Sequence, residues 1–292
     1  MKNINGHMVI DAPVFSTVKG TPYLQEPGVA LLGKQVVEPE VLRGLLSGFD
    51  PSLEFLDYLN DEADIPVGEE ICKIAGQTCY ASFSPKRTKN DGAKKYFDNI
   101  KSSGHGSVME HAVWTFVIYG VSRSFSHELV RHRAGFGYSQ LSQRYVDGKV
   151  LRFVEKKSFQ NDLDLHELFT TEIDRAASLY HDAAQLLIKK QKLGLGILSA
   201  DQKTDLRKKV NQDAREFLPN STETIVTVTG NARAWRHFIE MRASEHAETQ
   251  IREVAYRIYL CLREVAPIIF DDYKEVQLKD GTMAIDTPHR KV

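Results

Sequence analysis

Two segments rich in β-branched and aromatic residues limit the folds open to this chain, because they lie far apart and long helical patterns separate them. Segments 111–123 (HAVWTFVIYGVSR) and 222–230 (TETIVTVTG) carry the residues that favour strands. Elsewhere, apolar residues recur at helical spacing. This mixture of strands and helices predicts one α+β domain.

Several of the helical patterns begin or end at residues that favour helix termini. We expect helices over 68–82, from 94 to a glycine-rich exit near 104, and over 124–135, 171–194 and 204–219. Segment 231–267 is helical almost throughout and ends at Pro267. Its length allows either one long helix or two helices that meet near Arg242.

The two ends of the chain show weaker patterns than the middle. Prolines between positions 13 and 66 repeatedly interrupt the N-terminal part, so we expect residues 1–65 to form an irregular extension packed on the core. The main domain is predicted over 66–275. Residues 276–292 are polar and are expected to form a weakly ordered tail.

Composition excludes several classes of partner. The chain has 38 Lys and Arg against 39 Asp and Glu, so it lacks the basic excess that a nucleic-acid-binding surface needs. Its longest apolar runs are too short to cross a bilayer, and its start lacks the apolar core of a signal peptide. We therefore expect a cytoplasmic protein without membrane or nucleic-acid partners.

The common cofactor-binding patterns are also missing from the sequence. The three cysteines form no CxxC, and no His/Cys cluster has the spacing of a zinc site, so no metal is expected. Buried, reduced thiols are the simplest explanation of these cysteines. Neither GxxxxGK[ST] nor GxGxxG occurs, which excludes the usual phosphate-binding loops.

The segment 131–145 (RHRAGFGYSQLSQRY) concentrates hydrogen-bond donors around little apolar surface. Buried cations are costly unless they are paired, so a packed core does not account for this run. Gly135 and Gly137 let the backbone approach a ligand closely. Arg144, with Ser142 and Gln143 beside it, combines a guanidinium fork with hydroxyl and amide groups, as phosphate sites do. The segment therefore predicts an anion-binding site.

Three further groups of polar residues have weaker signals. Glu128 and Arg131 are three residues apart on the predicted helix, where they could face a site or simply form an ion pair. The turn SGHGSVMEH (103–111) is consistent with a ligand contact or a plain loop. In the helix from Asn231, polar residues cluster away from an apolar face, which either a site or a solvated helix face explains.

Taken together, these motifs resemble those of the flavin-dependent thymidylate synthases. The resemblance rests on RHRAGFGYSQLSQRYV, SGHGSVMEHAVWTF, SRSFSHELVRHR and AREFLPNSTETIVTVTGNARAWRHFIEMRASEHAETQIR, and it continues to VAPIIFDDY. It covers most of residues 70–273 in the expected order. One departure is that Arg133 and Ser142 enclose eight residues, one more than the family pattern has. We expect a small bulge near the two glycines to restore the register by Tyr138.

The resemblance implies an α+β fold with a central, mostly antiparallel sheet and long helices, not a Rossmann fold. It implies that residues 66–275 form a catalytic domain that converts deoxyuridine monophosphate (dUMP) to thymidine monophosphate (dTMP). Methylenetetrahydrofolate would supply the carbon, FAD the hydride and NADPH the reducing equivalents. A homotetramer with sites between subunits is also implied. No cysteine lies in a matched motif, in keeping with a mechanism without a cysteine nucleophile.

The resemblance also implies residue roles, with Arg242 as the catalytic group that stabilises charge on the pyrimidine. The implied substrate-binding residues are Glu128, Arg131, Gln140, Ser142, Gln143, Arg144, Arg215 and Arg242. The implied cofactor-binding residues are His105, Ser107, Arg131, His132, Arg133, Gln140, Asn231, Arg233 and His237.

Two other functions remain compatible with the sequence. A relative that methylates uridine monophosphate (UMP) or another pyrimidine nucleotide would need a different sugar contact, and the longer spacer lies close enough to the site to provide one. A non-catalytic flavin- or RNA-binding relative would keep the scaffold. The joint presence of Ser142, Arg144 and Arg242 favours an enzyme over such a relative.

Overall fold

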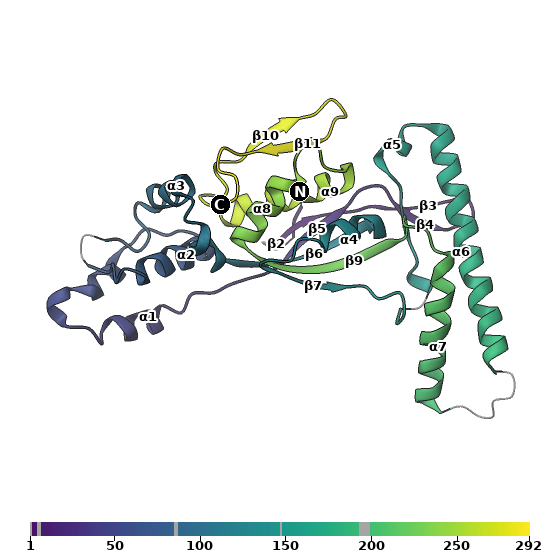
Figure 1. Ribbon diagram of the computed structural model, residues 1–292, viewed down its shortest axis with the longest axis horizontal. Helices are drawn as coiled ribbons and strands as arrows, with labels where there is room; N and C mark the ends of the chain where they lie inside the picture. The colour runs from purple at the N-terminus through teal and green to yellow at the C-terminus, as the bar shows by residue number, and fades with distance from the viewer. Residues whose placement is uncertain (1, 5–6, 85–86, 147, 193–198) are drawn as a thin grey trace.

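A six-stranded sheet runs through the middle of the molecule in the computed structural model (Figure 1), which describes residues 2–4, 7–84, 87–146, 148–192 and 199–292. Its order is β1-β2-β5-β6-β9-β7, and every neighbouring pair is antiparallel. The strands are β1 (Lys2–Ile4), β2 (His7–Ile10), β5 (Gly28–Lys34), β6 (Val113–Ser122), β7 (Phe136–Gln140) and β9 (Glu223–Asn231). The expected antiparallel α+β fold is confirmed.

The two central strands are the ones that the β-branched segments predict. In β6, Trp114, Phe116 and Ile118 are buried at every second position, and Val226 and Val228 of β9 do the same. This alternation points one face of each strand at the core. β6 and β9 pair from Val113↔Asn231 to Ser122↔Glu223, with one irregularity after Ile118.

Helices α8 (Ala232–Arg242) and α9 (Thr249–Val265) pack over the sheet and form the main core with it (Figure 1). Segment 231–267 therefore forms two helices, and the first ends at Arg242 as the second alternative predicts. The Glu248 carboxylate caps α9 by accepting the N–H groups of Gln250 and Ile251, which satisfies donors at the new helix start.

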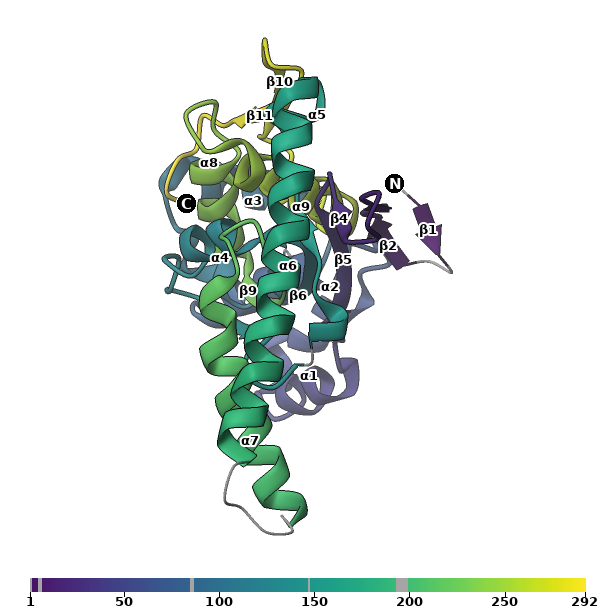
Figure 2. The same cartoon turned by 90° about the vertical axis from the view of Figure 1, so that its right-hand side faces the viewer.

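Two helical projections extend from opposite ends of the sheet. Helices α6 (Leu163–Lys192) and α7 (Ala200–Ala214) run side by side as a long arm, and α1 (Pro39–Leu46), α2 (Val67–Thr78) and α3 (Ala93–Ser103) lie at the other end (Figures 1 and 2). The predicted end of the first arm helix, near Gly194, lies outside the described residues. No helix in the described part of the chain combines the length and apolar character needed to span a membrane.

The remaining elements are short. They are β3 (Val14–Ser16), β4 (Pro22–Leu24), β8 (Phe153–Val154), α4 (Arg123–Leu129), α5 (Lys157–Gln160), β10 (Lys274–Gln277), β11 (Met283–Asp286) and 3-10 turns at Pro51–Leu53, Phe55–Asn60, Gly106–Glu110, Gly148–Val150 and Arg215–Phe217. The sheet β3-β4-β8 carries Tyr23 and Phe153, which pack on Phe169 and Ile173 of α6 and attach the arm.

The N-terminal expectation is wrong in one respect, because the first 65 residues are not irregular. They supply β1, β2 and β5 of the central sheet, and Val29 of β5 is part of the main core. Prolines obscured the strands of this region because Pro22 begins β4 and Pro27 directly precedes β5, positions where the missing N–H is tolerated. The boundaries at residues 65 and 275 stay predictions.

The prediction for 124–135 is also wrong, because α4 ends at Leu129 and a separate strand, β7, begins at Phe136. The glycine and the polar residues of this strand have low strand propensity, so its sequence does not indicate a strand. Its position depends on pairing with β9, from Phe136↔Gly230 to Gln140↔Val226. The structure is thus determined here by tertiary contacts more than by local preference.

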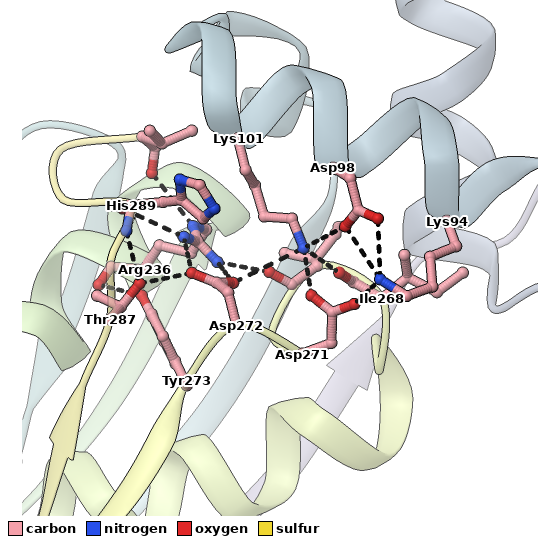
Figure 3. A network of polar contacts seen from close by, with 12 residues as sticks. Lys94, Asp98, Lys101, Arg236, Ile268, Asp271, Asp272, Tyr273, Thr287 and His289 are labelled. Carbon is pink, nitrogen blue, oxygen red and sulfur yellow. Dashed lines mark hydrogen bonds and ion pairs between the residues drawn. The ribbon is translucent and has the colours of Figure 1, made fainter.

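The polar tail is ordered, contrary to expectation. Strands β10 and β11 form a hairpin, and the following segment 287–292 returns to α8 (Figure 3). Val292 is buried in the main core. Composition concealed this order because the segment is held largely by backbone groups that contact buried Arg236 and half-buried Glu240.

A buried carboxylate should make the stability of this fold depend on pH. Glu69 is fully buried, and its Oε1 accepts the N–H groups of Ile268 (2.6 Å) and Ile269 (3.0 Å). Burial raises the pKa of Glu69 to about 7. The folded state therefore retains a proton that the unfolded chain loses near pH ~4.3. This stabilisation is complete below that pH and is lost as the pH rises through about 7.

We predict that Glu69→Gln, which stays neutral, removes this dependence. Relative to the native protein, the variant should gain about 3 kcal/mol in unfolding free energy between pH ~4 and pH ~8. Urea unfolding at several pH values measures the difference. Glu62→Gln, at an exposed position, is the control. A difference between Glu69→Gln and native protein that does not vary with pH would contradict the assignment.

Candidate active site

The predicted site residues gather along β7, the edge strand of the sheet, and on the helices beside it. β7 follows the turn after α4, and its partner β9 leads directly into α8. Residues before β7 therefore meet α8, whereas residues after β7 meet the start of β9. The two ends of the five-residue strand are about 13 Å apart.

The first end is organised around the guanidinium of Arg242. Arg242 Nη1 donates to Glu128 Oε2 (2.8 Å), and its Nε donates to His132 Nε2 (2.9 Å). All three side chains are half-buried. Glu128 thus pairs with Arg242 and not with Arg131, because α4 ends at Leu129 and no longer carries Arg131 on the same face. The sequence could not show this contact, which joins residues 114 positions apart.

His132 is held as a neutral ring by this arrangement. Burial lowers the pKa of His132 to about 4, and the charges of Arg242 and His237 add to the effect. Because Nε2 accepts a hydrogen bond from Arg242, the ring proton is assigned to Nδ1. The ring packs edge-on against Phe238, with 5.1 Å between centroids. His132 therefore orients Arg242 without adding a second positive charge.

A tight turn leads from this cluster into β7. Gly135 has φ of 74°, and a Cβ there would lie 2.8 Å from the Ala234 Cβ and from Asn231 Nδ2. The Asn231 N–H donates to the Gly135 carbonyl (3.2 Å), and the Asn231 side chain caps α8. Pairing with β9 is regular from Phe136 to Gln140, so the expected bulge near the two glycines does not occur within β7. The positive φ lies at Gly135, in the turn before the strand, and the place of the additional spacer residue stays a prediction.

A second turn lies beside the N-terminal part of α8. His105, Gly106 and Ser107 enter the 3-10 turn Gly106–Glu110, and His105 and Ser107 are exposed. Arg233 Nη1 donates to Glu110 Oε1 (2.6 Å), which links the turn to α8. The structure thus places His105 and Ser107 near the helix that carries Arg233 and His237, as one site would require.

Arg131 and Arg133 are exposed between these groups. Neither side chain pairs with a carboxylate in the described part of the chain. Buried cations elsewhere are paired, as Arg236 is with Asp272. An exposed guanidinium without a partner close to other donors is suited to an anionic ligand.

The other end of β7 forms a second group. Gln140 Nε2 donates to Thr224 Oγ1 (3.0 Å), and the Arg144 N–H donates to Ser142 Oγ (3.3 Å). Arg144 is exposed and lies over the ring of Tyr145. Gln143 lines a small cavity of about 30 Å³. These residues leave the Arg144 guanidinium open to a ligand.

Arg215 approaches this group from the end of α7. Its carbonyl accepts the Leu218 N–H (2.9 Å), and the same loop ends at Thr222, whose carbonyl accepts the Arg123 N–H (2.9 Å). Burial, with a smaller effect of Arg215, lowers the pKa of Arg123. The effect of Arg215 shows that the two guanidiniums lie close to each other, so Arg123 is a second arginine at this end. Sequence reasoning missed it, although it lies in the motif SRSFSHELVRHR.

A groove of about 660 Å³ opens beside Arg242, between residues 244–247 and the β10–β11 hairpin. Met241, Val276 and Ile285 give it an apolar part, and Arg242 stands at its edge. Among the described residues, no group of His, Cys, Asp and Glu could hold a metal ion. The site therefore offers cations, neutral hydrogen-bonding groups and apolar surface.

These features define an α+β protein with exposed arginines beside an edge strand of its sheet. Residues 62–268 match the family described as thymidylate synthase complementing protein. Flavin-dependent thymidylate synthases of Mycobacterium bovis and Mycobacterium tuberculosis are 44% identical over 227 residues, which cover 77% of this chain and 87% of theirs. That of Mycobacterium sp. strain KMS is 44% identical over 231 residues, 78% of this chain and 88% of its own. The chain therefore belongs to the flavin-dependent thymidylate synthase family.

One solved structure extends the comparison of the fold. The structure of a UMP/dUMP methylase, PolB, from Streptomyces cacaoi, bound with 5-Br dUMP, superposes with a TM-score of 0.56. The two chains are 19% identical, and the match covers 85% of this chain and 94% of the other. At this identity the likeness concerns the fold alone.

We predict that His132 stays uncharged across the neutral range. Its folded-state pKa of about 4 lies below the unfolded value of about 6.5. The neutral ring therefore stabilises the fold above pH ~6.5, and this contribution is lost as the pH falls through about 4. In NMR, the ring signal of His132 should not move between pH ~8 and ~5.5. The same signal in urea-unfolded protein is the control, and a folded-state midpoint near ~6.5 would refute the assignment.

Proposed function

We propose that this protein is an FAD-dependent thymidylate synthase that methylates dUMP to dTMP. Methylenetetrahydrofolate supplies the one-carbon unit, and NADPH reduces the flavin. The observation that supports the proposal is the cluster of Arg242, Glu128 and His132, in a chain that belongs to the flavin-dependent thymidylate synthase family. A binding protein without catalysis would have less need of a guanidinium held in one orientation.

Arg242 is the proposed catalytic residue. A guanidinium has five N–H donors, and the bonds to Glu128 and His132 use two of them. The donors that remain can face a pyrimidine ring. Uracil C5 becomes more nucleophilic as negative charge develops on the ring, and a fixed guanidinium stabilises that charge. Glu128 and His132 keep the guanidinium oriented, so that little reorganisation is needed during the reaction.

The nucleotide is proposed to lie along β7, with its base at Arg242 and its phosphate near Arg144. Support comes from the open guanidinium of Arg144 and from the positive charges of Arg215 and Arg123 at that end. The proposed substrate-binding residues are Glu128, Arg131, Gln140, Ser142, Gln143, Arg144, Arg215 and Arg242. A site of this length fits a nucleoside monophosphate better than a free base.

FAD is proposed to bind across the turn at His105 and the N-terminal part of α8. The exposed guanidiniums of Arg131 and Arg133 suit its diphosphate, so the residues present fit the cofactor. When bound and reduced, FAD supplies the hydride for the methyl group. The proposed FAD-binding residues are His105, Ser107, Arg131, His132, Arg133, Gln140, Asn231, Arg233 and His237.

The assembly and location of the protein also belong to the proposal. A homotetramer with sites between subunits is supported by the position of these residues on an edge strand, where a second chain can complete the site. We assign the protein to the cytoplasm, and expect no nucleic-acid or membrane partner, from its near-neutral composition.

The test of this function is a comparison of two substrates. Purified protein with FAD, methylenetetrahydrofolate and NADPH should release tritium from 5-tritiated dUMP and form dTMP. Tritiated UMP should react much more slowly. Turnover of UMP but not of dUMP would indicate a ribonucleotide methylase. Flavin binding without turnover of either nucleotide would indicate a non-catalytic relative.

We predict that Arg242→Lys lowers dTMP formation by about a hundred-fold or more, the effect of losing one donor of an oxyanion-hole type. Lysine keeps the charge but cannot bond Glu128 and His132 with a planar fork. The FAD content and the NADPH-driven reduction of the flavin should persist. Arg175→Lys is the matched control, because Arg175 also pairs with a glutamate but is exposed on α6. A near-native rate for Arg242→Lys would show that the residue is not catalytic.

A further inference from the structure

The guanidinium of Arg236 is a hub that joins three segments distant in the sequence (Figure 3). Arg236 is 1% exposed on the inner face of α8, and its two terminal nitrogens bind both oxygens of Asp272 (2.8 and 2.9 Å). Further bonds go to backbone oxygens of Ile269, His289 and Val292. These five bonds match the five donors of a guanidinium. Arg236 is therefore fully committed to internal contacts.

Segment 287–292 depends on this hub at both of its ends. The Thr287 hydroxyl donates to Asp272 Oδ2 (2.5 Å), and a backbone oxygen of Val292 accepts from Arg236 Nε (3.3 Å). Between them, the Lys291 N–H donates to Glu240 Oε2 on α8 (3.0 Å). Lys291 has φ of 63°, an unfavourable conformation for a residue with a Cβ. The contacts therefore hold the segment in one path, at the cost of local strain.

The same segment touches the turn that carries His105 and Ser107. A Cβ on Gly106 would lie 3.0 Å from the backbone carbon of Val292 and 3.2 Å from Arg233 Nε. Gly106 is buried, whereas the residues on either side of it are exposed. Val292 is thus wedged against the inner side of the turn. Its neighbour on the other side is α8, through Arg236.

The residues of α8 that hold segment 287–292 lie close to residues on the exposed face of the same helix. Arg236 and Glu240 are four residues apart and hold the segment, and His237 Nδ1 lies 3.6 Å from the same Glu240 oxygen that Lys291 contacts. Arg233 and His237 are exposed, and both are proposed FAD-binding residues. Fixing Arg236 and Glu240 therefore fixes the direction in which Arg233 and His237 point.

We propose that segment 287–292 is a clamp that sets the spacing between the turn 105–107 and α8, and so shapes the FAD site. Arg236 is its positioning residue and does not itself contact the cofactor. The inference rests on the proposed function, because it concerns the FAD site of that function. The clamp lies beyond residues 62–268, which match the family.

The first experiment measures FAD affinity in variants of the clamp. A chain shortened after Asp286 and a Thr287→Val variant should both bind FAD more weakly, the shortened chain by about tenfold or more, the effect of losing hydrogen bonds to charged groups. Thr287→Ser keeps the hydroxyl and should restore near-native affinity. Fluorescence titration of FAD-free protein gives the Kd, and the thermal midpoint of the same samples reports folding.

A second pair of variants tests the backbone contact itself. Lys291→Pro removes the N–H that binds Glu240 and cannot adopt a positive φ, whereas Lys291→Gly keeps the N–H and relieves the strain. We expect weaker FAD binding in the proline variant alone. Gly106→Ala should also weaken FAD binding by crowding Val292. Gly44→Ala, where a Cβ meets nothing within 4 Å, is its control.

A positioning role and a merely structural role give different results. With a clamp, saturating FAD should restore the turnover of dUMP and leave its KM near the native value. If the segment has a merely structural role, the variants should have a lower thermal midpoint, and their binding of dUMP and of FAD should weaken equally. Unchanged FAD affinity in all folded variants would overturn the clamp alone. A native protein that takes up no FAD would overturn the proposed function and the clamp together.

Discussion

The pairing of β6 with β9 is the constraint on which the rest of the structure depends. The two strands are antiparallel, so the end of β6 lies beside the start of β9, and each strand leads at once into a helix. α4 therefore starts at one end of the pair and α8 at the other. Both helices return over the sheet, and this brings Glu128 to Arg242 although the two are 114 positions apart. The site is a product of strand register more than of any single motif.

The sequence predicts the elements whose evidence is local. β-branched and aromatic residues identify β6 and β9, and apolar spacing identifies α6, α7, α8 and α9. It fails where the deciding contact is distant. β7 is a strand because β9 lies beside it, and residues 287–292 are ordered because Arg236 binds their backbone oxygens. Neither contact leaves a periodic signal in the residues that receive it.

In the candidate site too, the sequence predicts what depends on local residues and misses what depends on distant contacts. The residue types in 131–145 indicate anion binding from their chemistry alone, and exposed Arg131 and Arg133 are consistent with that. The expected helix 124–135 allows an ion pair between Glu128 and Arg131 as one alternative, but α4 ends early and Glu128 pairs with Arg242 instead. The cationic side chains of the core and of the candidate site thus fall into two groups. Buried ones such as Arg236 are paired to hold the fold, and exposed ones beside β7 keep donors for a ligand.

The turn at Gly135 has a consequence for comparing distant relatives. Because the pairing of Phe136 with Gly230 fixes β7, a residue added before that pair enlarges a surface turn and leaves every later side chain in place. Loop length and side-chain placement are therefore independent at this point of the chain. A search pattern that demands the family's fixed spacing between Arg133 and Ser142 would not match this sequence, although β7 pairs regularly with β9 after the turn. Relatives of this kind are better aligned from the strand than by counting residues from the arginines.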